Sequence, residues 1–417
     1  MTSKNKVLDH ASLTARNSTP VADGPEDSGF AIFSATQIGE SNKRRVLQML
    51  FDLGPTSRAE LARLTGTKRT TITGIVQPLI EAGLLIEVDP NEKRGVGKPA
   101  RPLWFSASAA PVCAVFLMPD KVETALISLT GGVSAHRQVP IAPGKRNRET
   151  YIDALVAGVD HALAQAPRQA LGIGVAVGGM VDPADGSIVA MNLAPAMAGL
   201  GLRDLLEDRF ALPTIVDHHP RALLLGERWF GAGRGMGNFA VIYADEVLGC
   251  AMYLDGKPFR GPHGSGGELG HTIVDLNGGT CTCGKRGCWE TVATLGWLRD
   301  RAAEAGLPGA ERLDSERLVD LSAQMPAAGA LLSRYAHNIA IGIANLQTLL
   351  MPDNFIIYGD VRRGGEIMQQ FLTREISGLA ASLPGNPITV FLGQNEQTIT
   401  LQGAAGLIVS KQLEIEY

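Results

Sequence analysis

Three of the five cysteines lie within one short stretch of the chain, shortly after a histidine. His271, Cys281, Cys283 and Cys288 together offer one imidazole and three thiolates, which suit a closed tetrahedral structural zinc site with no open catalytic position. Glycines among these residues would let a short loop fold sharply enough to bring the ligands together. The alternative is a set of ordinary buried thiols, which the clustering disfavours. We therefore predict a structural Zn²⁺ site in the loop 271–288.

A second group of candidate residues is polar or basic and lies near the N-terminus. Some members begin a predicted helix, where short polar and cationic side chains can reach base edges and phosphates of DNA. Others lie in a basic loop that suits phosphate or minor-groove contact. A solvated basic face is the alternative. These candidates are Lys68, Arg69, Thr70, Thr71 and Thr73 in the helix and Arg94, Lys98 and Arg101 in the loop.

The elements that would position this second group follow the order of a winged helix-turn-helix. Apolar residues recur at helical spacing over 46–51, and a Gly-Pro-Thr break at 54–56 ends that helix. Ser57 is placed to cap a second helix carrying Leu61 and Leu64. A third helix is predicted from about 68 to 82, although Gly74 and Pro78 are poor residues for a helix interior. A strand over 84–88, the loop 89–102 and a strand over 103–105 complete the wing.

Charge is distributed unevenly along the chain. Residues 41–105 carry 11 Lys and Arg against 6 Asp and Glu, a balance of +5, so the remainder carries -9 of the total of -4. A basic segment attached to an acidic body is typical of a nucleic-acid reader with a separate sensor, and a solvated basic face would give the same balance.

Composition limits the class of protein further. With 45% hydrophobic and 19% charged residues the chain is of the globular type, and no apolar run approaches the ~18 residues of a membrane span. The N-terminus lacks the apolar segment of a signal peptide. Clustered cysteines favour a reduced compartment over a disulfide framework. We therefore expect a cytoplasmic protein with no membrane partner.

The rest of the chain alternates strands with helices. Strands are predicted over 113–118, 124–129 and 172–177, with a helix over about 148–166, which is an α/β pattern. A helix around Gly403 is expected to pack back on the first part of this body. Residues 1–38 are rich in polar residues and proline without sustained periodicity, so we expect a mostly disordered tail.

Several segments resemble the ROK family of repressors and sugar kinases. The stretch 42–91, especially Gly-Pro-Thr-Ser-Arg-Ala-Glu-Leu-Ala at 54–62, resembles the DNA-binding head of ROK repressors. The body resembles the family at 226–235, at Leu-Asp-Gly-Lys over 254–257, at Gly-Glu-Leu-Gly-His over 267–271, and in the cysteine-rich block 281–290. Together these segments cover almost everything after the tail.

The resemblance implies an α/β body of two lobes with the actin-like sugar-kinase (ROK) fold, closing over a sugar. We expect the winged helix-turn-helix at 39–106, lobe 1 at 107–222 completed by about 402–417, and lobe 2 at 223–401 with the zinc-binding loop. In ROK kinases the positions of Glu268, His271 and Glu290 contact sugar hydroxyls, and Asn192 is expected to add an amide. The alternative is that the two glutamates only brace the zinc loop.

The kinase parts of the family pattern are altered in this sequence. Where the family has an Asn-Asp pair whose Asp is the catalytic base, this chain has His218 and His219, so the base position is His219. The two phosphate turns align with 116–120 and 245–247, where Pro119 lacks an N–H and Asp245 and Glu246 would repel a nucleotide. We therefore expect no ATP and no catalytic residue. Both histidines could form hydrogen bonds with an effector; the alternative is that they are a packed or solvated pair.

These observations predict a non-enzymatic transcriptional regulator, expected to be a repressor of carbohydrate-related genes. It would bind a double-stranded, pseudo-palindromic DNA operator as a homodimer or a dimer of dimers, and respond to a sugar or sugar derivative. The first alternative is an active ATP-dependent, hexokinase-type sugar kinase with an attached DNA-binding head. The second is a regulator controlled by a protein partner without sugar binding.

Overall fold

A computed structural model of the chain describes residues 35–89, 101–261, 266–380 and 387–415. Residues 42–417 form one compact unit. The first helix, α1 (Ala35–Leu53), begins four residues inside the expected tail, so that boundary is wrong: 35–38 are helical. The rest of the expected tail, together with Arg94 and Lys98, lies outside the described residues. Among the described helices, none has both the length and the apolar character needed to cross a bilayer.

The N-terminal domain has the predicted arrangement of three helices and a small sheet. Ser57 caps the second helix, since its Oγ accepts the Glu60 N–H at 3.2 Å. Gly66 ends that helix in the left-handed conformation at φ 68°. Strand β3 pairs with both β1 and β2. After α1 come β1 (Thr56–Ser57), α2 (Arg58–Thr65), α3 (Arg69–Glu81), β2 (Leu85–Glu87) and β3 (Pro102–Phe105).

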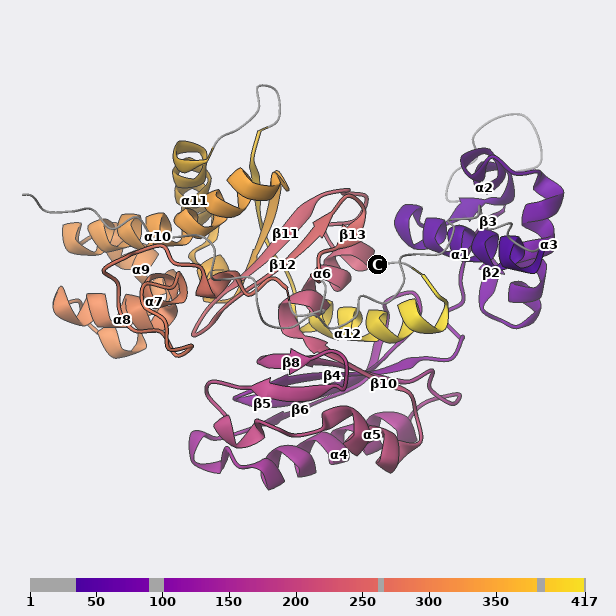
Figure 1. Cartoon of the computed structure of the whole chain (residues 1–417), viewed down its shortest axis with the longest axis horizontal. Helices are drawn as coiled ribbons and strands as arrows, with labels where there is room; N and C mark the ends of the chain where they lie inside the picture. Colours follow the sequence, from indigo (N-terminus) through magenta and orange to yellow (C-terminus); the bar gives the residue numbers. More distant parts are fainter. Residues whose placement is uncertain (1–34, 90–100, 262–265, 381–386, 416–417) are drawn as a thin grey trace, which may run out of the picture. The chain divides into compact units, whose positions relative to one another are not determined.

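Lobe 1 is built on a five-stranded sheet of order β10-β7-β4-β5-β6. Strands β4, β7 and β10 are parallel, and β4 and β7 consist of buried apolar residues and one glycine, as expected for strands buried on both faces. Helices α4 and α5 lie on one side of this sheet (Figure 1). The elements are β4 (Val112–Met118), β5 (Lys121–Ile127), β6 (Val133–Pro140), η1 (Pro143–Lys145), α4 (Arg148–Ala164), β7 (Ile173–Val177), β8 (Met180–Asp182), β9 (Ser187–Ala190), η2 (Pro195–Met197), α5 (Leu202–Phe210) and β10 (Thr214–His218).

Lobe 2 repeats this plan with a sheet of order β13-β12-β11-β14-β15, covered by its own helices. Its core is a separate apolar cluster around Trp289, Tyr335 and Phe355. The elements are β11 (Phe239–Ala244), β12 (Leu248–Leu254), β13 (Lys257–Pro258), η3 (Leu269–His271), α7 (Glu290–Ala293), α8 (Leu295–Glu304), η4 (Ala310–Arg312), α9 (Ser315–Ser322), α10 (Pro326–Leu350), β14 (Asn354–Tyr358), η5 (Asp360–Gly364), α11 (Gly365–Leu379) and β15 (Thr389–Leu392).

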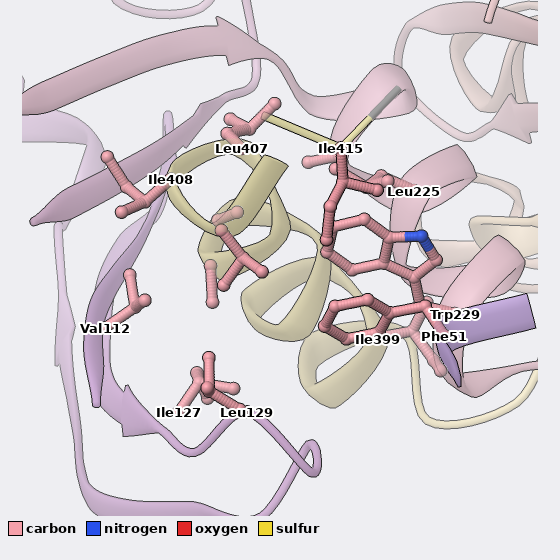
Figure 2. Close-up of a cluster of buried hydrophobic side chains, with 14 of the residues drawn as sticks. Phe51, Val112, Ile127, Leu129, Leu225, Trp229, Ile399, Leu407, Ile408 and Ile415 are labelled. Atoms are coloured by element: carbon pink, nitrogen blue, oxygen red, sulfur yellow. The ribbon is translucent and has the colours of Figure 1, made fainter. Parts of the chain in front are cut away.

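Two further helices, α6 (His219–Phe230) and α12 (Glu396–Gln412), pack directly on one another. An added Cβ at Gly403 would lie 1.7 Å from the Ala222 carbonyl oxygen, so the backbones touch at a distance that only glycine permits. As expected, the C-terminal helix packs back on lobe 1, against β4 and β7, although it begins at Glu396 and not near 402. Figure 2 shows the apolar cluster around these helices, which includes Trp229, Ile399 and Leu407.

Candidate functional site

A cavity of about 820 Å³ lies where the two lobes meet. Lobe 1 contributes the turn between β4 and β5, the segment after β7 and the end of β9. Lobe 2 contributes the turn between β11 and β12, η3, the start of α7 and η5. The N-terminus of α6 reaches the cavity as well. The volume is in the range of pockets that enclose a small molecule.

The four predicted metal ligands converge in the loop after η3. One ligand atom from each of His271, Cys281, Cys283 and Cys288 lies within 4.8 Å of the others. The Cys281 Sγ is 3.5 Å from His271 Nδ1, and the Cys283 and Cys288 sulfurs are 3.7 Å apart. This spacing of one imidazole and three thiols fits a tetrahedral metal site.

The backbone of this loop explains how the ligands meet. Gly287 has φ 72°, and an added Cβ there would lie 1.7 Å from the Asp275 carbonyl oxygen. The Lys285 backbone N–H lowers the pKa of the Cys283 thiol, whereas burial raises the pKa of Cys288 to about 12. A bound cation would offset that second effect by favouring the thiolate.

The predicted sugar-binding carboxylates stand beside the metal site and line the cavity. Glu268 precedes η3, which ends at His271, and Glu290 begins α7 two residues after Cys288. Burial raises the pKa of both carboxyls. If Nδ1 of His271 binds the metal, its Nε2 remains for a ligand. Asn192 also lines the cavity, from the segment that follows β9.

Glu290 is held in place through its neighbour Trp289. The indole is 1% exposed, and its Nε1 donates to the Asn338 carbonyl of α10 at 2.8 Å. The same ring lies against Gly342, where an added Cβ would be 2.2 Å from two ring carbons. The loop that carries Cys288 and Glu290 is therefore anchored on α10.

The two histidines of the altered kinase motif have different environments. His218 Nδ1 is 3.6 Å from Glu268 Oε1, and burial lowers the pKa of His218 to about 3, so the ring is neutral. His219 is 2% exposed and packs between Phe116 and Tyr243, with ring centroids 4.7 and 4.8 Å away. Its Nε2 lies 3.3 Å from Thr400 Oγ1. Of the two roles considered for the pair, this environment favours packing for His219 and a ligand contact for His218.

A buried ion cluster behind these histidines was not predicted. Asp217 is 1% exposed and accepts from Arg221 Nε at 2.5 Å, while Arg260 Nη2 lies 2.9 Å away. Although burial alone would raise it, the two guanidiniums hold the Asp217 pKa below its usual value. The i, i+4 spacing of Asp217 and Arg221 was visible in the sequence, but the third member comes from the segment after β13.

The two former phosphate turns face the same cavity. Pro119 and Asp120 form the turn between β4 and β5, and the Pro119 carbonyl accepts the Tyr151 hydroxyl at 2.6 Å. Asp245 and Glu246 lie across from them between β11 and β12.

This side of the cavity carries carboxyl groups together with arginines: Arg299 pairs with Glu246 at 2.5 Å, and Arg312, Arg362 and Arg363 also line it. Burial raises the pKa of Asp245 to about 6 and raises that of Asp360, which accepts from Ser315 N at 2.9 Å and Oγ at 2.7 Å. Glu396 also lines the cavity, and burial raises its pKa. Asp360 and Glu396 were missed, because neither lies in a recognisable motif.

The predicted DNA-binding residues lie at the exposed start of α3. Lys68 is the N-cap residue, and the four following candidates Arg69, Thr70, Thr71 and Thr73 are all exposed. On the opposite face of the helix, Ile72 and Val76 are fully buried. Arg101 is 61% exposed in its side chain and stands 3.9 Å from Glu87. Pro78 does not end α3, which continues to Glu81.

Comparisons with known proteins agree with this architecture. A family model described as "ROK family" matches residues 115–411. The chain is 24% identical to a xylose repressor of Bacillus spizizenii, covering 92% of this chain and 99% of that protein. A solved ROK family transcriptional regulator, described as a homologue of the Escherichia coli Mlc protein, aligns with TM-score 0.72 at 25% identity, over 90% of this chain and 99% of that one. A ROK glucokinase of Streptomyces griseus, solved with glucose and AMPPNP, aligns with TM-score 0.62 at 25% identity, over 72% and 99%.

Proposed function

The chain belongs to the ROK family, and from that premise we propose that it is a DNA-binding transcriptional regulator whose two-lobed body binds a sugar or sugar derivative. The observation that carries the proposal is the presence, in one chain, of a winged helix with an exposed polar recognition face and an interlobe cavity lined by Glu268, His271 and Glu290. The xylose repressor and the regulator described above, both similar over almost their whole length, support it. Repression of carbohydrate-related genes is the expected outcome of operator binding.

On the DNA side, α3 would lie in the major groove with its first turn toward the bases. Arg69 can contact guanine or phosphate, while the three threonine hydroxyls offer short donors and acceptors. Arg101, and the wing residues Arg94 and Lys98, would contact the backbone. A homodimer, or a dimer of dimers, would place two such helices on a pseudo-palindromic operator.

The metal that we propose for the four-ligand site is Zn²⁺ in a structural role. Three thiols and one imidazole suit zinc, and the set leaves no open coordination position. When bound, the ion would hold the loop closed and thereby fix the positions of Glu268 and Glu290. Those carboxylates would then accept hydrogen bonds from adjacent sugar hydroxyls.

We also propose that the body does not phosphorylate its ligand. His219 stands at the base position but is packed between two aromatic rings. On the lobe 2 side the former phosphate turn carries Asp245 and Glu246; Arg299 pairs with Glu246, and the carboxylate of Asp245 would repel a nucleotide's phosphates. The measurement is ADP release with ATP and a panel of hexoses, and sugar-dependent ADP release would contradict this part of the proposal.

The central experiment joins ligand binding to operator binding. A thermal-shift screen against sugars and sugar phosphates should find a ligand that, at 100 times its Kd, stabilises the protein by about 2.7 kcal/mol. The operator can be selected from random duplexes with the purified protein. The identified sugar should then change operator affinity in the wild type but not in Glu268→Gln, which keeps the head intact. If no sugar binds, or if binding leaves operator affinity unchanged, the proposed function is wrong.

A further inference from the structure

Helix α6 runs from the cavity to the DNA-binding head. At its N-terminus, His218, His219 and Pro220 line the cavity. At its C-terminus, Arg228 and Trp229 contact α1 of the head. With 12 residues the helix spans about 18 Å, and all of it from His219 to Trp229 is buried.

The contacts along α6 favour movement of the helix as one body. Added Cβ atoms at Gly226 and Gly406 would lie 2.1 Å from the Ile399 carbonyl oxygen and 2.7 Å from Leu225 Cδ2, so α6 and α12 are in close contact along their length. At the cavity end, an added Cβ at Gly249 of β12 would lie 2.6 Å from Pro220 Cγ. Such packing leaves little room for local adjustment, so a shift at one end is carried to the other.

The contact at the head end consists of an aromatic stack and an ion pair. Trp229 stacks on Phe51 with ring centroids 4.5 Å apart, and Phe51 stacks in turn on Phe105 of β3 at 4.1 Å. Arg228 Nη2 is 2.6 Å from Asp52 Oδ1, with the arginine side chain 8% exposed. Both α1 and the wing sheet of the head are therefore held by two neighbouring residues of α6. Figure 2 shows Phe51 and Trp229 side by side in the cluster.

Arg228 is only partly satisfied in this arrangement. Its Nε and Nη1 are buried and have no hydrogen-bond partner among the described residues. The Tyr253 ring, 5.2 Å from the guanidinium carbon, offsets part of that cost. A buried cation with unpaired donors raises the free energy of this arrangement. A modest change in the position of α6 can therefore exchange the ion pair of Arg228 with Asp52 for another contact of the guanidinium.

We propose that α6 couples the interlobe cavity to the DNA-binding head, with Arg228 and Trp229 as the residues that position the head. The inference rests on the proposed function in treating the cavity as the effector site. A ligand that displaces His218 from Glu268 shifts the N-terminus of α6, and the displacement reaches Asp52 and Phe51. Because coupling between two sites acts in both directions, a change at Asp52 should also affect the cavity.

The test measures amide hydrogen exchange of the full chain without DNA or sugar. His218→Ala perturbs the cavity end, and Asp52→Asn removes the charge at the head end with little change of shape. We expect His218→Ala to accelerate exchange in 46–53 of the head about fivefold or more, and Asp52→Asn to do the same in 245–249 at the cavity. In each of these two segments, the double variant should accelerate exchange by less than the product of the accelerations that the two single variants cause in that segment.

Two variants serve as matched controls. Asn192→Ala perturbs the cavity from the segment after β9, which is not part of α6, and Glu414→Gln removes the exposed ion pair of Arg44 with Glu414, a head contact that does not involve α6. Neither should produce a remote change. The inference is wrong if the α6 variants affect only their own surroundings, if the controls act remotely to the same extent, or if exchange also accelerates in the core strand 354–358.

Failure of the coupling can be distinguished from failure of the proposed function. D-xylose, D-glucose and N-acetyl-D-glucosamine are added to the wild type and to Asp52→Asn with the selected operator. A sugar that binds and changes operator affinity equally in both proteins would overturn the role of α6 and leave the function standing. If no sugar binds, the function fails, while the exchange measurement still decides the coupling.

Discussion

Replacing Gly342 by alanine should disturb the candidate site from a distance, through Trp289. An alanine Cβ would stand 2.2 Å from Cδ2 and Cε2 of the indole. Restoring a carbon–carbon contact of about 3.5 Å requires the ring and helix α10 to separate by about 1.3 Å. The indole N–H donates a hydrogen bond to the Asn338 carbonyl, and Trp289 lies between Cys288 and Glu290 in the chain. The displacement therefore moves a metal ligand and a cavity carboxylate together.

The loss of folding stability expected for Gly342→Ala has two destabilising contributions, and a gain in helix propensity opposes them. Overpacking of a filled core costs about 1–3 kcal/mol, and weakening the Trp289–Asn338 hydrogen bond adds about 1 kcal/mol. Alanine also gains about 0.5–1 kcal/mol over glycine within a helix. Gly329 of the same helix isolates that last term, because an added Cβ there meets only the Ser322 carbonyl oxygen at 3.7 Å. Gly342→Ala should therefore be less stable than Gly329→Ala by about 2–4 kcal/mol.

The assay is urea unfolding followed by tryptophan fluorescence, together with measurement of bound zinc after dialysis against a weak chelator. Gly329→Ala should match or slightly exceed the wild type in both measurements. Gly342→Ala should unfold at lower urea and retain less metal. Equal stability of the two variants would refute the packing argument, whereas lower stability with unchanged metal retention would refute only the link from Trp289 to the loop.

Three further predictions concern the metal, the cavity and the DNA. Cys281→Ser or Cys283→Ser should abolish zinc binding and the response of operator affinity to the sugar while the head stays folded; a metal-free variant that responds normally would show that the metal does not organise the site. Asp245→Asn should raise stability at pH 7.5 by up to about 2 kcal/mol and change it little at pH 4. The reason is that burial raises the pKa of Asp245 in the folded protein to about 6, above the pKa of this group in the unfolded chain. The protonated carboxyl therefore stabilises the fold, and this contribution is lost as pH rises from the unfolded-state pKa through about 6. Urea titrations at the two pH values measure the effect. Arg69→Ala should alter operator sequence preference, whereas Arg101→Ala should weaken binding to all duplexes and reduce the salt slope by about 1, and an unchanged slope would contradict the assignment of Arg101.

The sequence alone determined the features that depend on residues close together in the chain. The four metal ligands lie within one short loop, so their types and spacing were sufficient to predict that they meet. The helices and caps of the head follow from local signals, such as Ser57 before a helix and Gly66 after it. The α/β pattern and the family motifs likewise indicated two lobes, and the positions of Glu268 and Glu290 beside the metal loop followed from their nearness in sequence.

The tertiary structure decided what depends on distant segments. The sequence could not distinguish a ligand contact from a packed side chain at His219, because Phe116 and Tyr243, which enclose it, come from β4 and β11. It did not indicate that Arg260 completes the Asp217 cluster, or that α6 joins the cavity to Phe51 of the head. Short-range signals act through backbone geometry and capping, which neighbours in the chain set by themselves. Burial and ion pairing instead depend on which surfaces the whole fold brings together, and that information is spread over the entire chain.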